Sequence, residues 1–303
     1  MTAARTAKRT AGTSPSKLID QVLRARVREP VHFPDLSERR ALKLSAVPHY
    51  TARAHFELWH KRMGTPDFSE RAGIFTPLYY VDFETSDIEL EPRAMLQVRG
   101  ETQLAKTLDA DGVVDHLVRE GRHVVSRRDN GDERLVARAH LINVFTRFDA
   151  DPARRRVTEL PGYLGISGVP ARVIELPTLQ QLLPAERPPD GIESDVRVWH
   201  YGQTDPNRHV TSMEYLRMME CYVAEVLHRR GYDMRQLYFA AARMVYRKPC
   251  FRGESYRRIA WLRTEQPLVV AGAFLKGGDP PDARPAVAVE LTLRQHPDEP
   301  GTV

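Results

Sequence analysis

Three polar side chains alternate directly ahead of a long amphipathic segment in the second half of the chain. Asp205, Asn207 and His209 stand two residues apart in the sequence TDPNRHVTSMEY. In an extended or turn conformation, residues at i, i+2 and i+4 project to the same side, so the three side chains could converge on one cleft. A carboxylate and an imidazole take up and release protons, as general acid–base catalysis requires.

The residues that follow predict a helix from about Met213 to Arg230, and Thr211 or Ser212 can cap its first turn. Glu214 stands close to a capping-box position. The free amides of that turn and the helix dipole would attract a carbonyl oxygen as it gains negative charge. The same TDPN turn is also an ordinary helix start without catalytic content, because Asp and Asn cap helices and Pro fixes a bend.

The order of predicted elements repeats in the two halves of the chain, which favours a duplicated domain. In the first half we expect a helix at about 51–63 and strands at about 74–84, 95–108, 113–127 and 134–148, the last two joined by an Asn130-Gly131 turn. In the second half a strand at about 196–203 and the helix precede strands at about 237–248, 254–264, 268–275 and 286–295. HYTARAHFEL from His49 matches HVTSMEYLRM from His209 at an offset of 160. One long helix near the start of each half, followed by strands, predicts the α+β class, with antiparallel sheets wrapped on helices.

Changes in composition divide the chain into four parts. Residues 1–30 have the composition of a basic, disordered tail, in which a short helix could form at 18–27; a transit peptide has a similar composition. We expect an N-terminal domain at 31–150 and a Pro-rich and Gly-rich linker at 151–192. A C-terminal domain at 193–303 would then carry the polar cluster.

The charge balance argues against a nucleic-acid partner. The chain has 45 lysines and arginines against 40 aspartates and glutamates, and the excess lies in residues 1–29, so the remainder is electroneutral. The longest apolar stretch, about nine residues, is far short of the roughly 20 that span a bilayer. Two cysteines form no disulfide framework or CxxC pair, and no HExxH pair occurs, so we expect no metal site. A reducing, cytoplasmic compartment is the expectation.

The segment before the long helix resembles the acyl-acyl-carrier-protein thioesterases, which are double hotdog proteins. Their pattern is approximately DxNxHVNNxxY, to which this sequence supplies Asp205, Asn207, His209, Val210 and Tyr215, while Thr211 and Ser212 replace the two asparagines. VYRKPC is similar to the family strand DYRREC, with Tyr246, Arg247 and Cys250 matching and Pro249 replacing the acidic residue. NVFTRFDADPARRRVTELP resembles the end of the family's first hotdog domain.

This resemblance covers about residues 31–296 and implies two tandem hotdog domains, each an antiparallel sheet wrapped around a long helix. It also implies hydrolysis of an acyl thioester of acyl carrier protein or coenzyme A, in fatty-acid or polyketide metabolism, without a cofactor. The first half has LSAVPHY, in which only His49 matches, so one site per chain is expected. A monomer and a homodimer both stay open, because two fused hotdogs already supply the pairing that single ones reach by dimerising.

Catalytic roles follow from the same resemblance. Asp205 and His209 would orient or activate the attacking water. The amides around Val210 and Thr211, helped by the Asn207 side chain, would stabilise the oxyanion.

Four further residues have implied roles. Glu220 stands where many hotdog thioesterases carry a glutamate on the central helix, and it is a competing base. Cys250 matches a suspected nucleophile, although a cysteine on a strand can also simply line the tunnel. Tyr215 and Arg247, together with Val210 and Thr211, would contact the substrate.

Other readings stay open. A double hotdog protein can pass its acyl group to another acceptor or decarboxylate it, and the departures at Thr211, Ser212 and Pro249 suggest a non-catalytic, carrier-binding protein. A basic patch near the site could recognise an acidic carrier protein or the phosphates of coenzyme A; its candidate members are Arg208, Arg229, Arg230, Arg247, Lys248, Arg252, Arg257 and Arg258.

Overall fold

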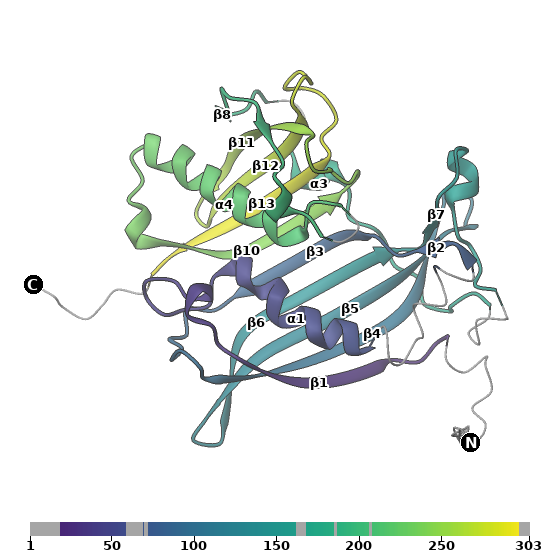
Figure 1. Cartoon of the computed structure of the whole chain (residues 1–303), viewed down its shortest axis with the longest axis horizontal. Coiled ribbons are helices and arrows are strands. Elements are labelled where there is room, and N and C mark those ends of the chain that lie inside the picture. Colours follow the sequence, from purple (N-terminus) through teal and green to yellow (C-terminus); the bar gives the residue numbers. More distant parts are fainter. Residues whose placement is uncertain are drawn as a thin grey trace, which may run out of the picture.

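The computed structural model describes residues 19–58, 69, 72–161, 168–184, 187–205 and 208–296. Within these residues, the centre of the molecule is one continuous antiparallel sheet of 11 strands (Figure 1). Helices α1 (Val47–Phe56) and α4 (Ser212–Arg229) pack on the same face of this sheet and share one apolar core with it. The large antiparallel sheet with its helices confirms the predicted α+β class.

The first half of the chain forms one side of this sheet. Its elements are β1 (Leu23–Pro30), α1, β3 (Leu78–Thr85), β4 (Met95–Leu108), β5 (Val114–Asp129) and β6 (Asp132–Val144). The short strands β2 (Ile74–Phe75) and β7 (Thr146–Arg147) pair with each other. A 3-10 turn, η3 (Leu44–Ala46), leads directly into α1. Strands β5 and β6 meet at Asn130 and Gly131, whose φ angles of 48° and 98° suit the predicted tight turn.

The second half forms the other side of the sheet. Its elements are β8 (Gly191–Ile192), β9 (Arg197–Val198), α4, β10 (Leu237–Tyr246), β11 (Ser255–Glu265), β12 (Leu268–Lys276) and β13 (Val287–Gln295). Between the halves, the linker contains the short helix α3 (Leu179–Leu182).

The two halves have the same strand order. Outward from the middle of the sheet, the order is β3-β6-β5-β4-β1 on one side and β10-β13-β12-β11-β8 on the other. β3 and β10 join the halves as an antiparallel pair, with Val81 opposite Met244. This repeated topology confirms the predicted duplication.

The short sequence match at an offset of 160 does not describe this duplication. α1 begins at Val47, so His49 lies inside the first turn of the helix. His209 instead precedes Thr211, the N-cap of α4. The first-half helix therefore begins five residues earlier than the match predicts. The part of the predicted helix from 59 to 63 lies outside the described residues.

Part of the predicted tail is a strand. Leu23, Ala25 and Val27 alternate with arginines, and the more buried side chains along β1 follow this alternation. Because a strand points successive side chains to opposite faces, this pattern places the apolar residues against the core and the arginines in solvent. The helix expected at 18–27 is therefore wrong, and residues 23–30 belong to the sheet, paired with β4.

The strand expected at 196–203 is also much shorter than predicted. Only Arg197 and Val198 pair with β11, and the chain then turns through a 3-10 segment at Tyr201–Gln203. This turn carries the chain to the start of α4.

Helix α4 packs closely on the second half of the sheet. Its buried side chains recur with helical spacing and form an apolar stripe, namely Tyr215, Leu216, Met219, Tyr222, Val223, Val226 and Leu227. A Cβ atom at Gly272 of β12 would lie 2.5 Å from the sulfur of Met219, so a larger residue there would displace the Met219 side chain. The buried stripe thus fixes where the start of α4 lies.

The linker crosses the opposite face of the sheet. Leu179 and Leu182 of α3 pack there on Tyr80, Val245 and Ala288. The sheet therefore has an inner face, covered by α1 and α4, and an outer face, covered in part by the linker.

Candidate active site

The loop before α4 is closed by Asp205. Its carboxylate Oδ1 accepts a hydrogen bond from the His209 amide at 3.1 Å. Its own amide donates to the His209 carbonyl at 2.9 Å, and the Arg208 amide donates to the Asp205 carbonyl at 2.8 Å. Arg208 has a φ of 66°, a left-handed conformation that this tight loop imposes. Asp205 thus positions His209, while Asn207 lies outside the described residues.

His209 lies between the loop and the segment that follows β10. It forms an antiparallel bridge with Phe251, and their rings meet edge to face at 5.0 Å between centroids. The imidazole is half-buried. The loop and the aromatic ring together hold His209 two residues ahead of the α4 cap.

The amides of Val210 and Thr211 are already bonded to the protein backbone. The Val210 amide donates to the Cys250 carbonyl at 2.9 Å, and the Thr211 amide donates to the Gln203 carbonyl at 3.0 Å. These two amides therefore do not form the predicted oxyanion site. Within the described residues, the amides of Ser212 and Met213, at the first turn of α4, donate to no acceptor.

Thr211 is the residue that caps α4. Its hydroxyl accepts a hydrogen bond from the Glu214 amide at 3.4 Å. Because the cap satisfies the Glu214 amide, the donors that stay free at this end are one and two positions after Thr211. The sequence predicted the helix start but placed the free donors too early, since the Val210 amide bonds to the distant Cys250 and the Thr211 amide bonds back across the loop to Gln203.

Cys250 and Tyr215 lie inside an aromatic cluster. The Cys250 amide donates to the Tyr215 hydroxyl at 3.0 Å, and Tyr215 packs edge to face on Trp199 at 5.1 Å. Cys250 is only 5% exposed, and burial raises the pKa of its thiol above the ordinary value. Since the thiolate is the reactive form, this environment favours a packing role for Cys250.

Glu220 lies apart from this loop, eight residues into α4 from Ser212, or about 12 Å along the helix axis. Its carboxylate accepts hydrogen bonds from both the amide and the hydroxyl of Ser45, the middle residue of η3. Burial raises the pKa of Glu220 from its ordinary 4.5 to about 7, while the Ser45 hydrogen bonds and the charge of Lys43 oppose this rise. Glu220 is thus a titratable group at the contact between the two halves.

Arg247 does not point toward the His209 loop. Its guanidinium donates to the carbonyls of Pro285 at 2.6 Å and Arg284 at 2.7 Å. These contacts fix the segment that leads into β13.

Three of the eight candidates for the predicted basic patch, Arg230, Arg247 and Arg258, have hydrogen-bond or ion-pair partners within the chain. Arg258 is buried and pairs with Glu193, and Arg230 pairs with Asp190. Arg208 and Arg252 are exposed, and the Arg252 guanidinium lies 5.6 Å from the centroid of the Tyr201 ring.

A buried polar cluster in the first half escaped the sequence analysis. Arg119 is 2% exposed and donates to the Asn143 Oδ1 atom at 2.5 Å, while its guanidinium also contacts the His55 ring. Nearby, burial lowers the pKa of His123 to about 4, and the charge of Arg119 adds to this effect. Arg119 and His123 share one face of β5, on which Leu117 and Val125 are also buried, so polar residues at the alternate positions of this face were the available signal.

No group of three or more His, Cys, Asp or Glu side chains among the described residues could hold a metal ion. None of the helices described is long and apolar enough to cross a membrane.

Comparisons with known structures place the fold. A Lactobacillus plantarum protein assigned as an oleoyl thioesterase superposes with a TM-score of 0.65 at 13% identity, covering 93% of this chain and 100% of that one. An acyl-ACP thioesterase from Bacteroides thetaiotaomicron gives 0.62 at 11% identity, with 89% and 98% covered. The 12:0-ACP thioesterase from Umbellularia californica gives 0.59 at 15% identity, with 90% and 94% covered.

At the level of sequence, no protein-family model and no curated protein matches the chain. Identities this low, together with near-complete coverage, establish shared architecture. The repeated strand order, the pairing of β3 with β10 and the two helices on one face agree with it. The chain therefore has the double hotdog fold of these thioesterase structures.

Proposed function

We propose that this chain hydrolyses an acyl thioester, carried on acyl carrier protein or coenzyme A, at the loop before α4. The observation that carries this proposal is the turn closed by Asp205, which holds His209 beside a helix start whose Ser212 and Met213 amides are free within the described chain. The double hotdog fold adds support but does not fix the chemistry, because one fold can host several reactions.

Hydrolysis requires a base, an oxyanion site and a departing thiol. In this proposal the His209 imidazole takes a proton from water as the water oxygen bonds to the thioester carbonyl carbon. The Ser212 and Met213 amides, aided by the positive end of the α4 dipole, stabilise the oxyanion. The carbon–sulfur bond then breaks, the proton passes to the departing sulfur, and a carboxylic acid and a free thiol result. Asn207 stays a predicted further donor to the oxyanion.

Glu220 is the competing base. A carboxyl group with a pKa of about 7 is half ionised at neutral pH, and this suits proton transfer. Its contacts with Ser45 place it toward the start of α1, so it would serve a thioester bound between the two halves. Replacing each residue in turn separates the two candidates, because both are active as bases only when deprotonated.

A non-catalytic, carrier-binding protein is the second candidate function. It is favoured by the Val210 and Thr211 amides, which already donate to backbone carbonyls, and by the burial of Cys250. Together these leave fewer reactive groups than the sequence predicted. Acyl transfer or decarboxylation at the same loop would give different products from the same substrates.

The test is product analysis with a panel of acyl chains on both carriers. Free thiol and free acid released in equal amounts support hydrolysis. Acyl groups recovered on an added acceptor, or loss of carbon dioxide, would replace hydrolysis by the alternatives. Carrier binding without turnover across the whole panel would support the non-catalytic function.

A further inference from the structure

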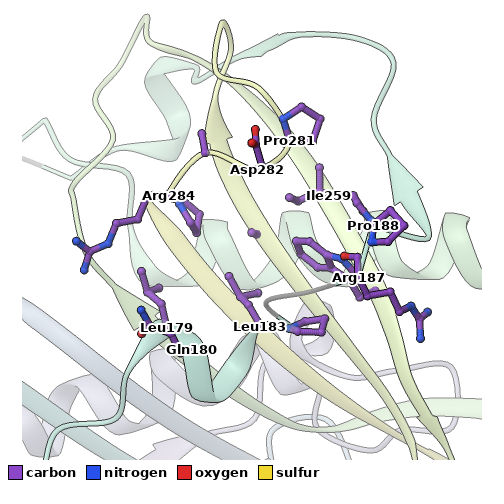
Figure 2. A pocket seen from close by; sticks show the side chains of 15 residues that line it. Leu179, Gln180, Leu183, Arg187, Pro188, Ile259, Pro281, Asp282 and Arg284 are labelled. Carbon is purple, nitrogen blue, oxygen red and sulfur yellow. The ribbon is translucent and has the colours of Figure 1, made fainter.

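A cavity of about 630 Å³ lies on the outer face of the second half of the sheet (Figure 2). Ile259, Trp261 and Ala273 line it from β11 and β12, and Leu179 and Leu183 line it from α3 and the residue after it. The segments 187–189 and 281–285 complete the rim. Its volume lies within the roughly 300–1,000 Å³ that is usual for small-molecule sites.

The cavity exists because small residues face large ones across two strands. Ile259 is opposite Ala273, and Trp261 is opposite Ala271, so β12 leaves space beside the bulky side chains of β11. The helix above them, α3, has only four residues and fills this space in part. An apolar outer face is thereby left open beside the linker.

This cavity is separate from the His209 loop. Along β11 and β12, Ala260 and Phe274 point into the inner core with α4, whereas their neighbours Ile259, Trp261 and Ala273 belong to an outer cluster. A molecule in the cavity would therefore be divided from α4 by the sheet itself.

The lining defines a mainly apolar ligand. The Trp261 indole N–H donates to the Arg187 carbonyl at 2.8 Å, so the ring offers the cavity an apolar surface. Charged side chains stand at the rim, and Arg187 already pairs with Asp190.

Arg284 is the cation available at the rim. It is exposed and forms no ion pair with any residue in the described part of the chain. Arg247 holds the Arg284 and Pro285 carbonyls and so fixes this edge of the cavity. Asp282, also exposed, lies at a different part of the rim, and the Arg284 side chain extends outward from its own part (Figure 2), so an anionic headgroup at the mouth of the cavity would be drawn to the Arg284 end.

We propose that this cavity binds a carboxylate with a single apolar chain, that is, a free fatty acid. The cavity and the charge at its rim do not depend on the proposed function. The choice of a fatty acid as the ligand does rest on the proposed function, because hydrolysis of an acyl thioester releases such an acid. The site would then be a second binding site for product, on the far side of the sheet from the reaction.

Tryptophan fluorescence locates the ligand once Trp59, which lies outside the described residues, is replaced by phenylalanine in every variant, because Trp261 lines the cavity while Trp199 lies in the inner core beside Tyr215. The probe is dibromostearate, whose bromine atoms quench tryptophan on contact, added to the full-length chain. We expect saturable quenching in the parent and loss of most of it in Trp261→Phe. Quenching that persists in Trp261→Phe, or no binding at all, would overturn the proposal.

Two variants test the cavity itself. Ala273→Phe fills the floor and should weaken dibromostearate binding at least tenfold. Arg284→Ala should weaken binding of dodecanoate at least fivefold while leaving dodecanol binding within about twofold, and Arg235→Ala, an exposed arginine elsewhere, should change neither. Unchanged dodecanoate binding in Arg284→Ala would contradict the assigned headgroup contact even if Ala273→Phe fails to fold.

These measurements are independent of catalysis. A chain that binds the fatty acid at Trp261 but hydrolyses nothing would overturn the proposed function alone. A chain that hydrolyses thioesters but shows no ligand at Trp261 would overturn this inference alone.

Discussion

The carboxylate of Glu220 accepts hydrogen bonds from the amide and the hydroxyl of Ser45. Glu220 belongs to the helix of the second half, and Ser45 belongs to the turn that opens the helix of the first half. A group with a pKa near neutrality thus connects the two hotdog domains at their contact. The protonation of Glu220 can therefore be followed near neutral pH, through the pH dependence of kcat/KM or through the infrared band of its carboxyl group.

Replacing Glu220 with glutamine distinguishes the two candidate bases. If Glu220 is the base, kcat/KM of the parent rises with pH through about 7, because only the ionised carboxylate accepts a proton. Glu220→Gln should then lose about 100-fold or more and lose that inflection. With His209 as the base, which we propose, Glu220→Gln retains activity within about tenfold. A loss beyond 100-fold, with the inflection removed, would transfer the role to Glu220.

Ser45→Ala should shift the Glu220 titration upward. The Ser45 hydrogen bonds stabilise the carboxylate and hold its pKa down against burial, so removal of the hydroxyl raises the pKa above about 7. The shift can be followed by carboxyl infrared absorption, with Glu220→Gln identifying the band. Ser37→Ala, at another serine of the first half, is the control. A downward shift would contradict the contact.

The positions of the long strands along the chain were largely predictable, because alternation of apolar and polar residues has the period of a strand. β4 has the bounds that its sequence predicted, and α4 begins within one residue of the expected position. β1 carried the same signal in the run from Leu23 to Arg28. It was misassigned because its arginines were counted as part of a basic tail, although arginine is well suited to the exposed face of an edge strand.

The site was predictable only in part. Asp205 and His209 are neighbours in sequence, and local turn chemistry brings them together. The partner of the Val210 amide, the burial of Cys250 and the contact of Glu220 with Ser45 all depend on residues far away in the chain. Local patterns cannot encode such long-range contacts.

Cys250→Ala tests whether the thiol takes part in the reaction. Since burial raises the pKa of this thiol and Tyr215 covers its backbone, we expect the variant to keep thioesterase activity within about threefold. Cys221→Ala, at the exposed cysteine of α4, is the matched control. If a folded Cys250→Ala variant loses more than 100-fold in thioesterase activity while the control stays active, Cys250 is the nucleophile after all.

Acid should destabilise the first half through His123. The folded chain protonates this buried ring only near pH 4, whereas the unfolded chain protonates it near 6.5. The unfolded state therefore binds more protons between these values, and stability falls as the pH drops from about 6.5 to 4, by up to about 3 kcal/mol.

Denaturant unfolding of His123→Leu checks this directly. The variant should lose that part of the pH dependence, and at pH 7 it should be little destabilised, since the His123 ring nitrogens have no hydrogen-bond partner within the described chain. His228→Leu, at an exposed histidine of α4, should unfold with the pH dependence of the parent. An unaltered acid response in His123→Leu would rule out this histidine as the cause.

Thiol release from acyl thioesters by the parent and by His209→Ala tests the proposed reaction most directly. His228→Ala, which changes a histidine at the far end of the same helix, is the control, and circular dichroism checks that all three fold. We predict that the parent and the control hydrolyse the preferred acyl thioester at similar rates, while His209→Ala loses at least about 100-fold in kcat/KM. A folded His209→Ala protein that hydrolyses the same thioester as fast as the parent would contradict the assignment of the reaction to this loop.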